Sequence, residues 1–245
     1  ASNPLLFSIK IDSLVNGLLR IYTNQSHGGI DLENQTIINN GEPLTPNLDN
    51  DDPHFKVIYS LMVDRFQDGT LENNDPVDDS KIHPLANYHG GDIAGITQKI
   101  KEGYFSDLGI NSIWISPIMQ GPDRSFTESV PPFRNYSGYH GYWPVNSREV
   151  DPRFGTEAEL RTMISAAHDQ DISVILDFVS NHTHEEHPFF SEHRNWYGEV
   201  EMPDGSLNIR NWSNETMLTT WFDTFLPTFD YENNDGYWPG TKLLR

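Results

Sequence analysis

The sequence predicts an α/β fold: the first part of a (β/α)8 barrel of the TIM type, with a small subdomain inserted after the third strand and a short β-rich N-terminal segment. Three strand-then-helix units follow one another, and their strands are almost continuously apolar. Strands of that kind are typical of a parallel sheet covered by helices. The long insertions all follow the C-terminal ends of strands, where barrel proteins carry their functional loops.

The N-terminal segment, residues 1–52, differs from the rest of the chain. Its apolar stretches, such as 18–22, are short and interrupted by Asn, Gly and Pro, and it ends in the acidic turn 47–53. We therefore expect an extended or β-rich segment followed by a linker.

The barrel region, residues 53–182, opens with the strand-like apolar run Val57–Val63. Apolar residues at helical spacing then run from Ile93 to Leu108, and Gly109 ends the predicted helix. Together they predict the first strand-then-helix unit.

Two further units follow. The second strand is predicted at Ser112–Ile115, and after a long loop a second helix starts near Thr156, which forms a capping-box pattern with Glu159. Its apolar residues recur at helical spacing, as Leu160, Met163, Ile164 and Ala167. The third strand is predicted at Ile172–Val179.

The remainder of the chain lacks this pattern. Residues 183–228 are rich in His, Trp, Asn and Glu, and we interpret them as the inserted subdomain; residues 229–245 are expected to return towards the barrel. A barrel needs eight units and about three are present. We therefore expect an N-terminal part of a larger protein, completed by a complementary C-terminal chain or segment.

Composition excludes several classes of protein. The net charge of −20 argues against nucleic-acid and anionic-membrane partners, because such a surface repels phosphate. The absence of cysteine excludes disulfides, thiol catalysis and cysteine-ligated zinc. The sequence contains no run of about 18 apolar residues, so it predicts no membrane-spanning helix. The N-terminus lacks a basic segment followed by an apolar one, so we expect no signal peptide in this chain.

Oxygen-bearing side chains gather in the loops after the first strand. Asp and Asn side chains together with backbone carbonyls suit a hard cation, and Ca²⁺ accepts six to eight such ligands. The candidate ligands are Asp68, Asn73, Asn74, Gly90 and Asp92. The alternative is a pair of ordinary turns, with Asp92 as the N-cap of the following helix.

The loop after the second strand concentrates aromatic residues. His140, Tyr142 and Trp143 lie among glycines in a loop predicted to be on the functional face, where they could stack on sugar rings. Core packing is the alternative for each of them, above all for Trp143.

The third strand delivers Asp177, Asn181 and His182 together at its C-terminal end. His182 could bond to a sugar hydroxyl, Asn181 could bind a cation, and Asp177 could pair with an arginine from elsewhere. The alternative is that these groups are simply hydrogen-bonded at a strand end.

In combination, these motifs resemble glycoside hydrolase family 13, the α-amylase family. The similarity covers residues 55 to 182 and extends to 231. It lies in motifs that occur in the family's order: Gly90-Gly91-Asp92, Leu108-Gly109-Ile110, Ile113-Trp114-Ile115-Ser116-Pro117, Gly141-Tyr142-Trp143, Asp151-Pro152-Arg153-Phe154-Gly155-Thr156 and Asp177-Phe178-Val179-Ser180-Asn181-His182.

The resemblance implies roles for individual residues. Tyr142 would stack on the sugar at the cleavage subsite, His182 would bond to that sugar's hydroxyls, and Asp177 would be a buried partner of the active-site arginine. By similarity to cyclodextrin glucanotransferases, the five candidate ligands named above would bind one Ca²⁺. Asn181 matches a ligand of a second calcium, but Thr228 stands where an acidic ligand often occurs, which leaves this second site open.

No segment matches the motifs that carry the family's nucleophile, general acid and third carboxylate. The leading hypothesis is therefore an extracellular, secreted, retaining glycosidase that acts on starch or related α-1,4-glucans, of which this chain is the N-terminal portion and is inactive alone. The alternative is a non-catalytic relative that binds carbohydrate or serves as a transporter accessory protein. A third possibility is an unrelated α/β domain.

Overall fold

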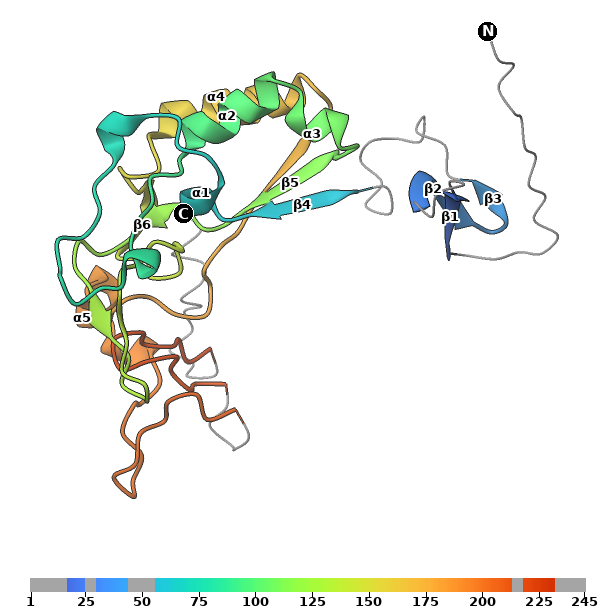
Figure 1. Cartoon of the computed structure of the whole chain (residues 1–245). Coiled ribbons are helices and arrows are strands. Elements are labelled where there is room, and N and C mark those ends of the chain that lie inside the picture. Colours follow the sequence, from blue (N-terminus) through green and yellow to red (C-terminus); the bar gives the residue numbers. More distant parts are fainter. Residues whose placement is uncertain (1–16, 25–29, 44–55, 213–217, 232–245) are drawn as a thin grey trace, which may run out of the picture. The chain divides into compact units, whose positions relative to one another are not determined.

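The computed structural model describes residues 17–24, 30–43, 56–212 and 218–231 (Figure 1). The chain divides into two units, residues 1–57 and 58–245. The predicted acidic turn and most of the predicted returning segment lie outside the described residues.

The first unit contains a small antiparallel sheet, in agreement with the β-rich character expected there. Its strands are β1 (Gly17–Asn24), β2 (Ile30–Asn39) and β3 (Glu42–Pro43), in that order across the sheet. Asn40 and Gly41 connect β2 to β3 with φ of 51° and 81°. This Asn-Gly pair supplies the left-handed turn that matches the twist of a hairpin.

The second unit is built on a parallel sheet, as the sequence predicts. It consists of β4 (Ile58–Leu61), β5 (Ser112–Ile115) and β10 (Ser173–Leu176), with β5 in the centre. Each strand thus lies beside the one that precedes it in this series, which is the neighbour order of a (β/α)8 barrel. The outer strands are shorter than predicted, because the chain leaves the sheet at Val63, whose N–H donates to Ser116 Oγ, and again after Leu176.

Helices cover one face of this sheet (Figure 1). After the short α1 (Val63–Phe66) come α2 (Ile93–Lys101), α3 (Tyr104–Asp107) and α4 (Glu157–His168). The core between helices and sheet is formed by fully buried apolar side chains of α2, α3, β5 and α4, namely Ile93, Ile96, Ile100, Phe105, Ile113, Ile115, Met163 and Ala167.

The single helix predicted at Ile93–Leu108 is wrong, because the chain breaks between α2 and α3. Gly103 lies between them with φ of 81°, in the left-handed region that glycine adopts readily. The break changes the direction of the apolar stripe, so Tyr104 and Leu108 are exposed while Phe105 is buried. Gly109, with φ of 72°, follows the end of α3.

The capping box predicted at the start of α4 is confirmed. Thr156 Oγ1 accepts from the N–H of Glu159 at 3.3 Å, and Glu159 Oε2 accepts from the N–H of Thr156 at 2.7 Å. This reciprocal pair satisfies two N–H groups that a helix start leaves open.

A second apolar region lies beyond the sheet. The short strands β6 (Met119–Gln120) and β9 (Asn146–Val150) pair with each other, as do β7 (Phe126–Thr127) and β8 (Asn135–Tyr136). Residues after β10 include α5 (Pro188–Glu192) and the 3-10 turn η4 (Arg194–Trp196). The apolar side chains of this region form two small clusters. One combines residues before and after β10, namely Phe126, Trp143, Phe225 and Leu226, and the other consists of Trp196, Tyr197 and Phe229.

The long segment between α1 and α2 contains two short 3-10 turns, η2 (Leu71–Asn73) and η3 (Pro84–Ala86). Within the described residues, none of the helices has the length and hydropathy needed to cross a lipid bilayer.

Candidate active site

The predicted site residues Tyr142 and Asp177 meet at the C-terminal edge of the parallel sheet. Asp177 directly follows β10, and its Oδ2 accepts a hydrogen bond of 2.5 Å from the phenol of Tyr142. Burial, followed by the bond to Asp177, raises the pKa of Tyr142 to about 12, so the phenol stays protonated and donates. Tyr142 as a whole is 40% exposed, so a ligand can reach it.

His182 is also at this edge but is nearly enclosed. It is 6% exposed, and its Nε2 lies 2.9 Å from the carbonyl oxygen of Tyr142. Its Nδ1 lies 3.3 Å from Nδ2 of Asn181. Burial lowers the pKa of His182, and the two contacts fit a neutral ring whose Nε2–H donates to the carbonyl while Nδ1 accepts from the amide. The structure thus places His182 as a support of the Tyr142 backbone, and its bond to a sugar hydroxyl stays a prediction.

His140 lies behind Tyr142. Its Nδ1 accepts from the N–H of Tyr142 at 3.0 Å, and the two rings are 5.7 Å apart. Burial lowers the pKa of His140 to about 4, so it accepts this bond as a neutral ring. Gly141 between them has φ of 81°, and a Cβ there would lie 1.9 Å from the carbonyl oxygen of Pro117. Only glycine lets the loop carry Tyr142 into this position.

Trp143 faces the opposite way. It is 3% exposed, and its indole packs 4.9 Å from Phe225 and 5.0 Å from Tyr136. Of the two interpretations open for Trp143, the structure therefore supports core packing, and the residue anchors the loop that presents Tyr142.

The predicted cation ligands also come together, in the loop between β4 and α2. Asp92 caps α2 by accepting from Gly95 N–H at 2.7 Å, and its other oxygen accepts from Asn73 Nδ2 at 3.2 Å. Asp68 Oδ2 accepts from Asn74 Nδ2 at 2.8 Å. The turn interpretation is thus correct for the Asp92 cap, but it does not account for every polar group in the loop.

Two oxygen atoms in this cluster are buried without a hydrogen-bond partner, Asp68 Oδ1 and Asn73 Oδ1. Buried polar atoms in proteins are normally paired, and a pair of unsatisfied oxygens beside the fully buried Asp92 carboxylate is a donor set that fits a hard cation. Gly90, with φ of 92°, brings its backbone against Asn74, since a Cβ there would lie 2.5 Å from Asn74 Oδ1.

Only two of the predicted cation ligands in the loop between β4 and α2 are carboxylates, Asp68 and Asp92. In the part of the chain that the structure describes, no three histidine or acidic side chains converge on one point. A cation here would depend on Asp68 and Asp92 together with amide and backbone oxygens.

The second predicted cation position is different. Asn181 is exposed, its backbone oxygen accepts from Phe229 N–H at 3.0 Å, and its side chain bonds to His182. Thr228 is 1% exposed, and its Oγ1 donates to the carbonyl oxygen of Thr220 at 2.9 Å. The hydroxyl of Thr228 is therefore used within the protein.

Sequence reasoning missed Phe222, whose ring lies 5.2 Å from that of His182. No pattern of residue types in the run Trp221-Phe222-Asp223 could have found it, because the structure buries Trp221 and the charged Asp223 and leaves the apolar Phe222 exposed.

Comparison with known proteins gives consistent matches. A family model described as alpha amylase, catalytic domain, matches residues 59–227. The cyclomaltodextrin glucanotransferase of Bacillus sp. (strain 17-1) is 37% identical over 162 residues, which cover 62% of this chain and 22% of the relative. An alpha-amylase of Niallia circulans is 39% identical over 135 residues, covering 52% of this chain and 24% of the relative.

A solved structure agrees. The alpha-amylase from Geobacillus thermoleovorans, crystallised as a complex with acarbose, matches with a TM-score of 0.53 and 34% identity, covering 73% of this chain and 34% of that one. The chain thus spans less than a quarter of the length of the two curated relatives.

Proposed function

The chain belongs to the alpha-amylase family, and from this premise we propose that it is the N-terminal part of a retaining glycosidase acting on starch-type α-1,4-glucans. The parallel sheet is accordingly the beginning of a TIM barrel. The observation that carries the proposal is the half-exposed Tyr142 ring, held by Asp177 at the C-terminal edge of this sheet.

The chain's own residues would bind and orient the sugar. The exposed face of Tyr142 offers an apolar plane to the C–H face of a pyranose, and its phenol is kept in place by the short bond to Asp177. His140 and His182 hold the backbone of Tyr142 from two sides through its N–H and its carbonyl. A platform fixed in this way loses little conformational entropy when the sugar binds.

The catalytic carboxylates would come from outside residues 1–245. A retaining mechanism needs a nucleophile and an acid/base carboxyl group about 5 Å apart. Asp177, the carboxylate at the end of β10, is instead bonded to Tyr142. Support for further strands comes from the sheet face opposite the helices, where Ile58 and Trp114 are exposed, as is Ile175 on β10, which pairs with Trp114. Apolar side chains in a barrel strand are normally covered by the other strands.

A calcium ion belongs to the same proposal. Asp68, Asn73, Asn74 and Asp92 with the carbonyl of Gly90 would hold it, and the bound ion would neutralise two carboxylates and supply the partners that Asp68 Oδ1 and Asn73 Oδ1 lack. Its effect would be to stabilise the loop between β4 and α2. An extracellular location is also part of the proposal, since polymeric glucans are too large to be taken up intact.

The test separates binding from turnover. Binding of acarbose and maltoheptaose to the full chain is measured by isothermal titration calorimetry, together with reducing-sugar release from starch. We expect binding without turnover, and a loss of binding of about tenfold in Tyr142→Ala, because one stacked ring is removed. Tyr104→Ala is the matched control, since Tyr104 is 38% exposed on α3 and should leave binding unchanged.

The outcomes are distinct. Starch hydrolysis by residues 1–245 alone would refute the assignment of the carboxylates to another segment. Absence of binding to either ligand would refute the sugar site. Binding that persists, without turnover, when the chain is supplied with its continuation would favour the alternative of a non-catalytic carbohydrate-binding or transporter-accessory protein.

A further inference from the structure

Arg65 lies where three segments near the candidate sugar site meet. It belongs to α1, and its side chain is 24% exposed. Its Nη2 donates to the carbonyl oxygens of Leu85 and Asn87 at 3.1 Å and 2.9 Å. Its guanidinium carbon lies 4.0 Å from the ring centroid of Tyr139. We name residues 137–142 the platform loop, because they end at Tyr142; Arg65 thus connects α1, η3 and the platform loop.

Other hydrogen bonds join the same segments. The carbonyl oxygen of Ala86 accepts from Ser137 N–H at 3.1 Å, which attaches η3 to the platform loop. Asp64 lies 3.1 Å from Arg65 Nε, and its Oδ1 also accepts from His89 N–H at 2.9 Å. When Arg65 is replaced, the Asp64 carboxylate therefore keeps a hydrogen bond and η3 stays attached. We expect such variants to fold.

The contacts continue from Tyr139 to Tyr142. The ring of Tyr139 lies 5.3 Å from the imidazole of His140 and is inclined to it by 66°. His140 Nδ1 accepts from the N–H of Tyr142 at 3.0 Å. A neutral imidazole can accept this bond, whereas a protonated imidazole carries N–H groups on both nitrogens and cannot. The backbone position of Tyr142 therefore depends on the protonation of His140.

Positive charge near His140 favours its neutral form. Burial, followed by the charges of His182 and Arg65, lowers the pKa of His140 to about 4. Arg65 stays charged throughout the pH range in which histidine titrates. Its guanidinium lies within about 10 Å of the imidazole, because both groups contact the ring of Tyr139.

The remaining groups around His140 are aromatic rings and two carboxylates that already have partners. The rings are those of Tyr136, Tyr139, Tyr142 and Trp143. Burial raises the pKa of Tyr136 and of Tyr142 to about 12, so both phenols are neutral. Asp64 pairs with Arg65, and Asp177 accepts from the Tyr142 phenol.

From these contacts we propose that Arg65 is a positioning residue for the sugar site: it fixes the platform loop through Tyr139, and its charge keeps His140 in the neutral form that accepts from Tyr142. The inference rests on the proposed function and adds to it a residue outside the stacking platform. It also implies a pH limit. Affinity for sugar falls when His140 becomes protonated, and Arg65 moves that loss to lower pH.

The experiment compares the full wild-type chain with Arg65→Gln and Arg65→Lys. Maltoheptaose affinity is measured by calorimetry from about pH 4 to about pH 8, a range that includes the titration of histidine. The titration of the His140 ring is followed by NMR without sugar, and His140→Gln serves to assign its signal. Melting temperatures are recorded for every variant.

Arg65→Gln removes the charge and most of the hydrogen-bond donors. We expect its His140 to titrate roughly half a pH unit higher, which is the effect of one charge about 10 Å away at an effective dielectric constant of about 50. The acid loss of affinity should shift upwards by the same amount. At neutral pH its affinity should be about two- to tenfold weaker, because binding must then order the platform loop.

Arg65→Lys separates the charge from the hydrogen bonds. Lysine keeps the positive charge but lacks the planar donor group that stacks on Tyr139 and reaches the carbonyls of η3. Its His140 should therefore titrate as in the wild type. Its affinity at neutral pH should be weaker than that of the wild type, as in Arg65→Gln.

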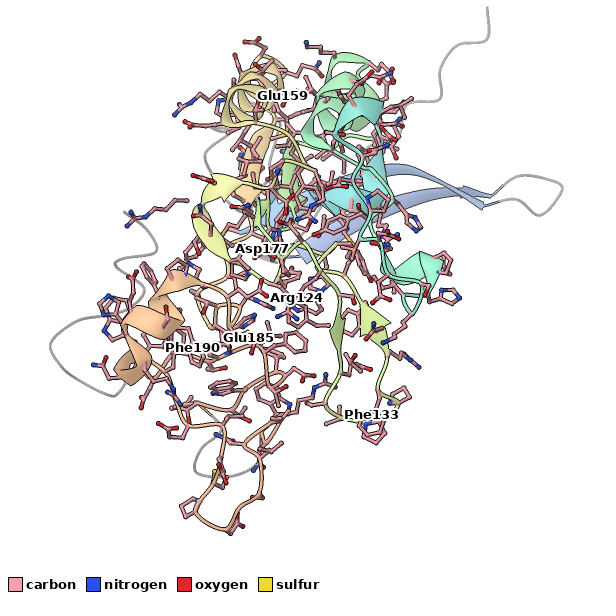
Figure 2. The ribbon with its side chains drawn as sticks, turned by 90° about the vertical axis from the view of Figure 1, so that its left-hand side faces the viewer. Arg124, Phe133, Glu159, Asp177, Glu185 and Phe190 are labelled. Carbon is pink, nitrogen blue, oxygen red and sulfur yellow. The ribbon has the colours of Figure 1, made fainter. Side chains whose placement is uncertain are left out.

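The matched control is Arg194→Gln. The guanidinium of Arg194 also lies over an aromatic ring, that of Phe190 at 5.4 Å, and it also donates to a backbone carbonyl, that of Tyr197 at 3.0 Å. Phe190 lies apart from Asp177 in Figure 2. The replacement should leave both the affinity and the titration of His140 unchanged.

Each result bears on the inference. If the wild type binds maltoheptaose and Arg65→Gln changes neither affinity nor the titration of His140, the inference is refuted while the Tyr142 site stands, even when the melting temperature falls. A shifted titration with unchanged affinity would refute the positioning role. An equal shift in Arg65→Lys would refute the role of the charge. Failure of the wild type to bind any maltooligosaccharide would refute the proposed function, and the inference with it.

Discussion

Replacing Asp68 by Asn should stabilise this protein in the absence of calcium and remove much of the stabilisation that calcium provides. The substitution keeps the shape of the side chain and one of its oxygens. That oxygen can still accept the hydrogen bond that Asn74 Nδ2 donates to Asp68 Oδ2 at 2.8 Å in the wild type. It removes the negative charge from a side chain whose Oδ1 is buried without a partner. The same atom destabilises the calcium-free protein and would be a ligand in the calcium-bound one.

The magnitudes follow from these contacts. A buried polar atom without a partner costs about 1–3 kcal/mol, and more when its group is charged, so without calcium the neutral variant should be the more stable by about 1 kcal/mol. Calcium at a hundredfold over its dissociation constant adds about 2.7 kcal/mol to the wild type if it binds only the folded state. A variant that binds calcium tenfold more weakly gains about 1.4 kcal/mol.

Thermal unfolding followed by circular dichroism measures both quantities. In a unit of this size, about 2.7 kcal/mol raises the melting temperature by roughly 5–11 °C. Melting curves are recorded in EDTA and across a calcium titration for the wild type, Asp68→Asn and Asp75→Asn. Asp75 is the matched control, because it is an exposed carboxylate in the same loop and is outside the ligand set.

Two results would refute the reasoning. A wild type whose melting temperature does not respond to calcium has no such site. A calcium response that is the same in Asp68→Asn as in the wild type would show that the ion, if bound, is not held by Asp68.

Three further predictions concern the support of the site. Thr156→Ala removes the capping box of α4 and should lower the free energy of unfolding by about 1 kcal/mol in urea titrations; an unchanged midpoint would contradict the assigned role. Gly141→Ala places a Cβ 1.9 Å from the Pro117 carbonyl oxygen and should destabilise the protein by more than Gly205→Ala, which has the same φ of 81° with no atom within 4 Å of its Cβ; equal melting temperatures would show that the contact is relieved without cost. Burial holds the pKa of His184 at about 3, below the ordinary value of about 6.5. Because the folded state disfavours the protonated ring, stability is complete above about pH 6.5 and falls as the pH decreases, by up to about 1.4 kcal/mol per pH unit; His184→Gln should flatten this decline in melting temperature, and an unaltered slope would assign the acid sensitivity to other groups.

Some of the fold could be predicted because the signals are local. Ser112–Ile115 was predicted as a strand and is β5 with the same bounds, since a short β-branched and aromatic run flanked by loops has few alternatives. The capping box of α4 was predicted because it depends on two residues three positions apart. The break at Gly103 was not predicted, because a single glycine inside a helical pattern costs only about 1 kcal/mol and packing decides whether the helix continues.

The features of the candidate site likewise fall into those that local sequence specifies and those that tertiary contacts specify. Sequence alone placed Tyr142 in the loop after the second strand and Asp177 and His182 at the C-terminal end of the third. It also identified the loop that contains Asp68 and Asp92, because strand ends and residue types are encoded locally. The tertiary structure decided which of these groups meet. The bond between Tyr142 and Asp177 joins residues 35 positions apart.

The tertiary structure also decided what each candidate can still do. Trp143 and His182 are enclosed, and Phe222 is exposed beside the imidazole, because their surroundings come from segments distant in the chain. The sequence by itself thus determined the family of the protein and the chemical groups available at its site. Their partners, exposure and protonation depend on contacts between distant residues, which no local pattern specifies.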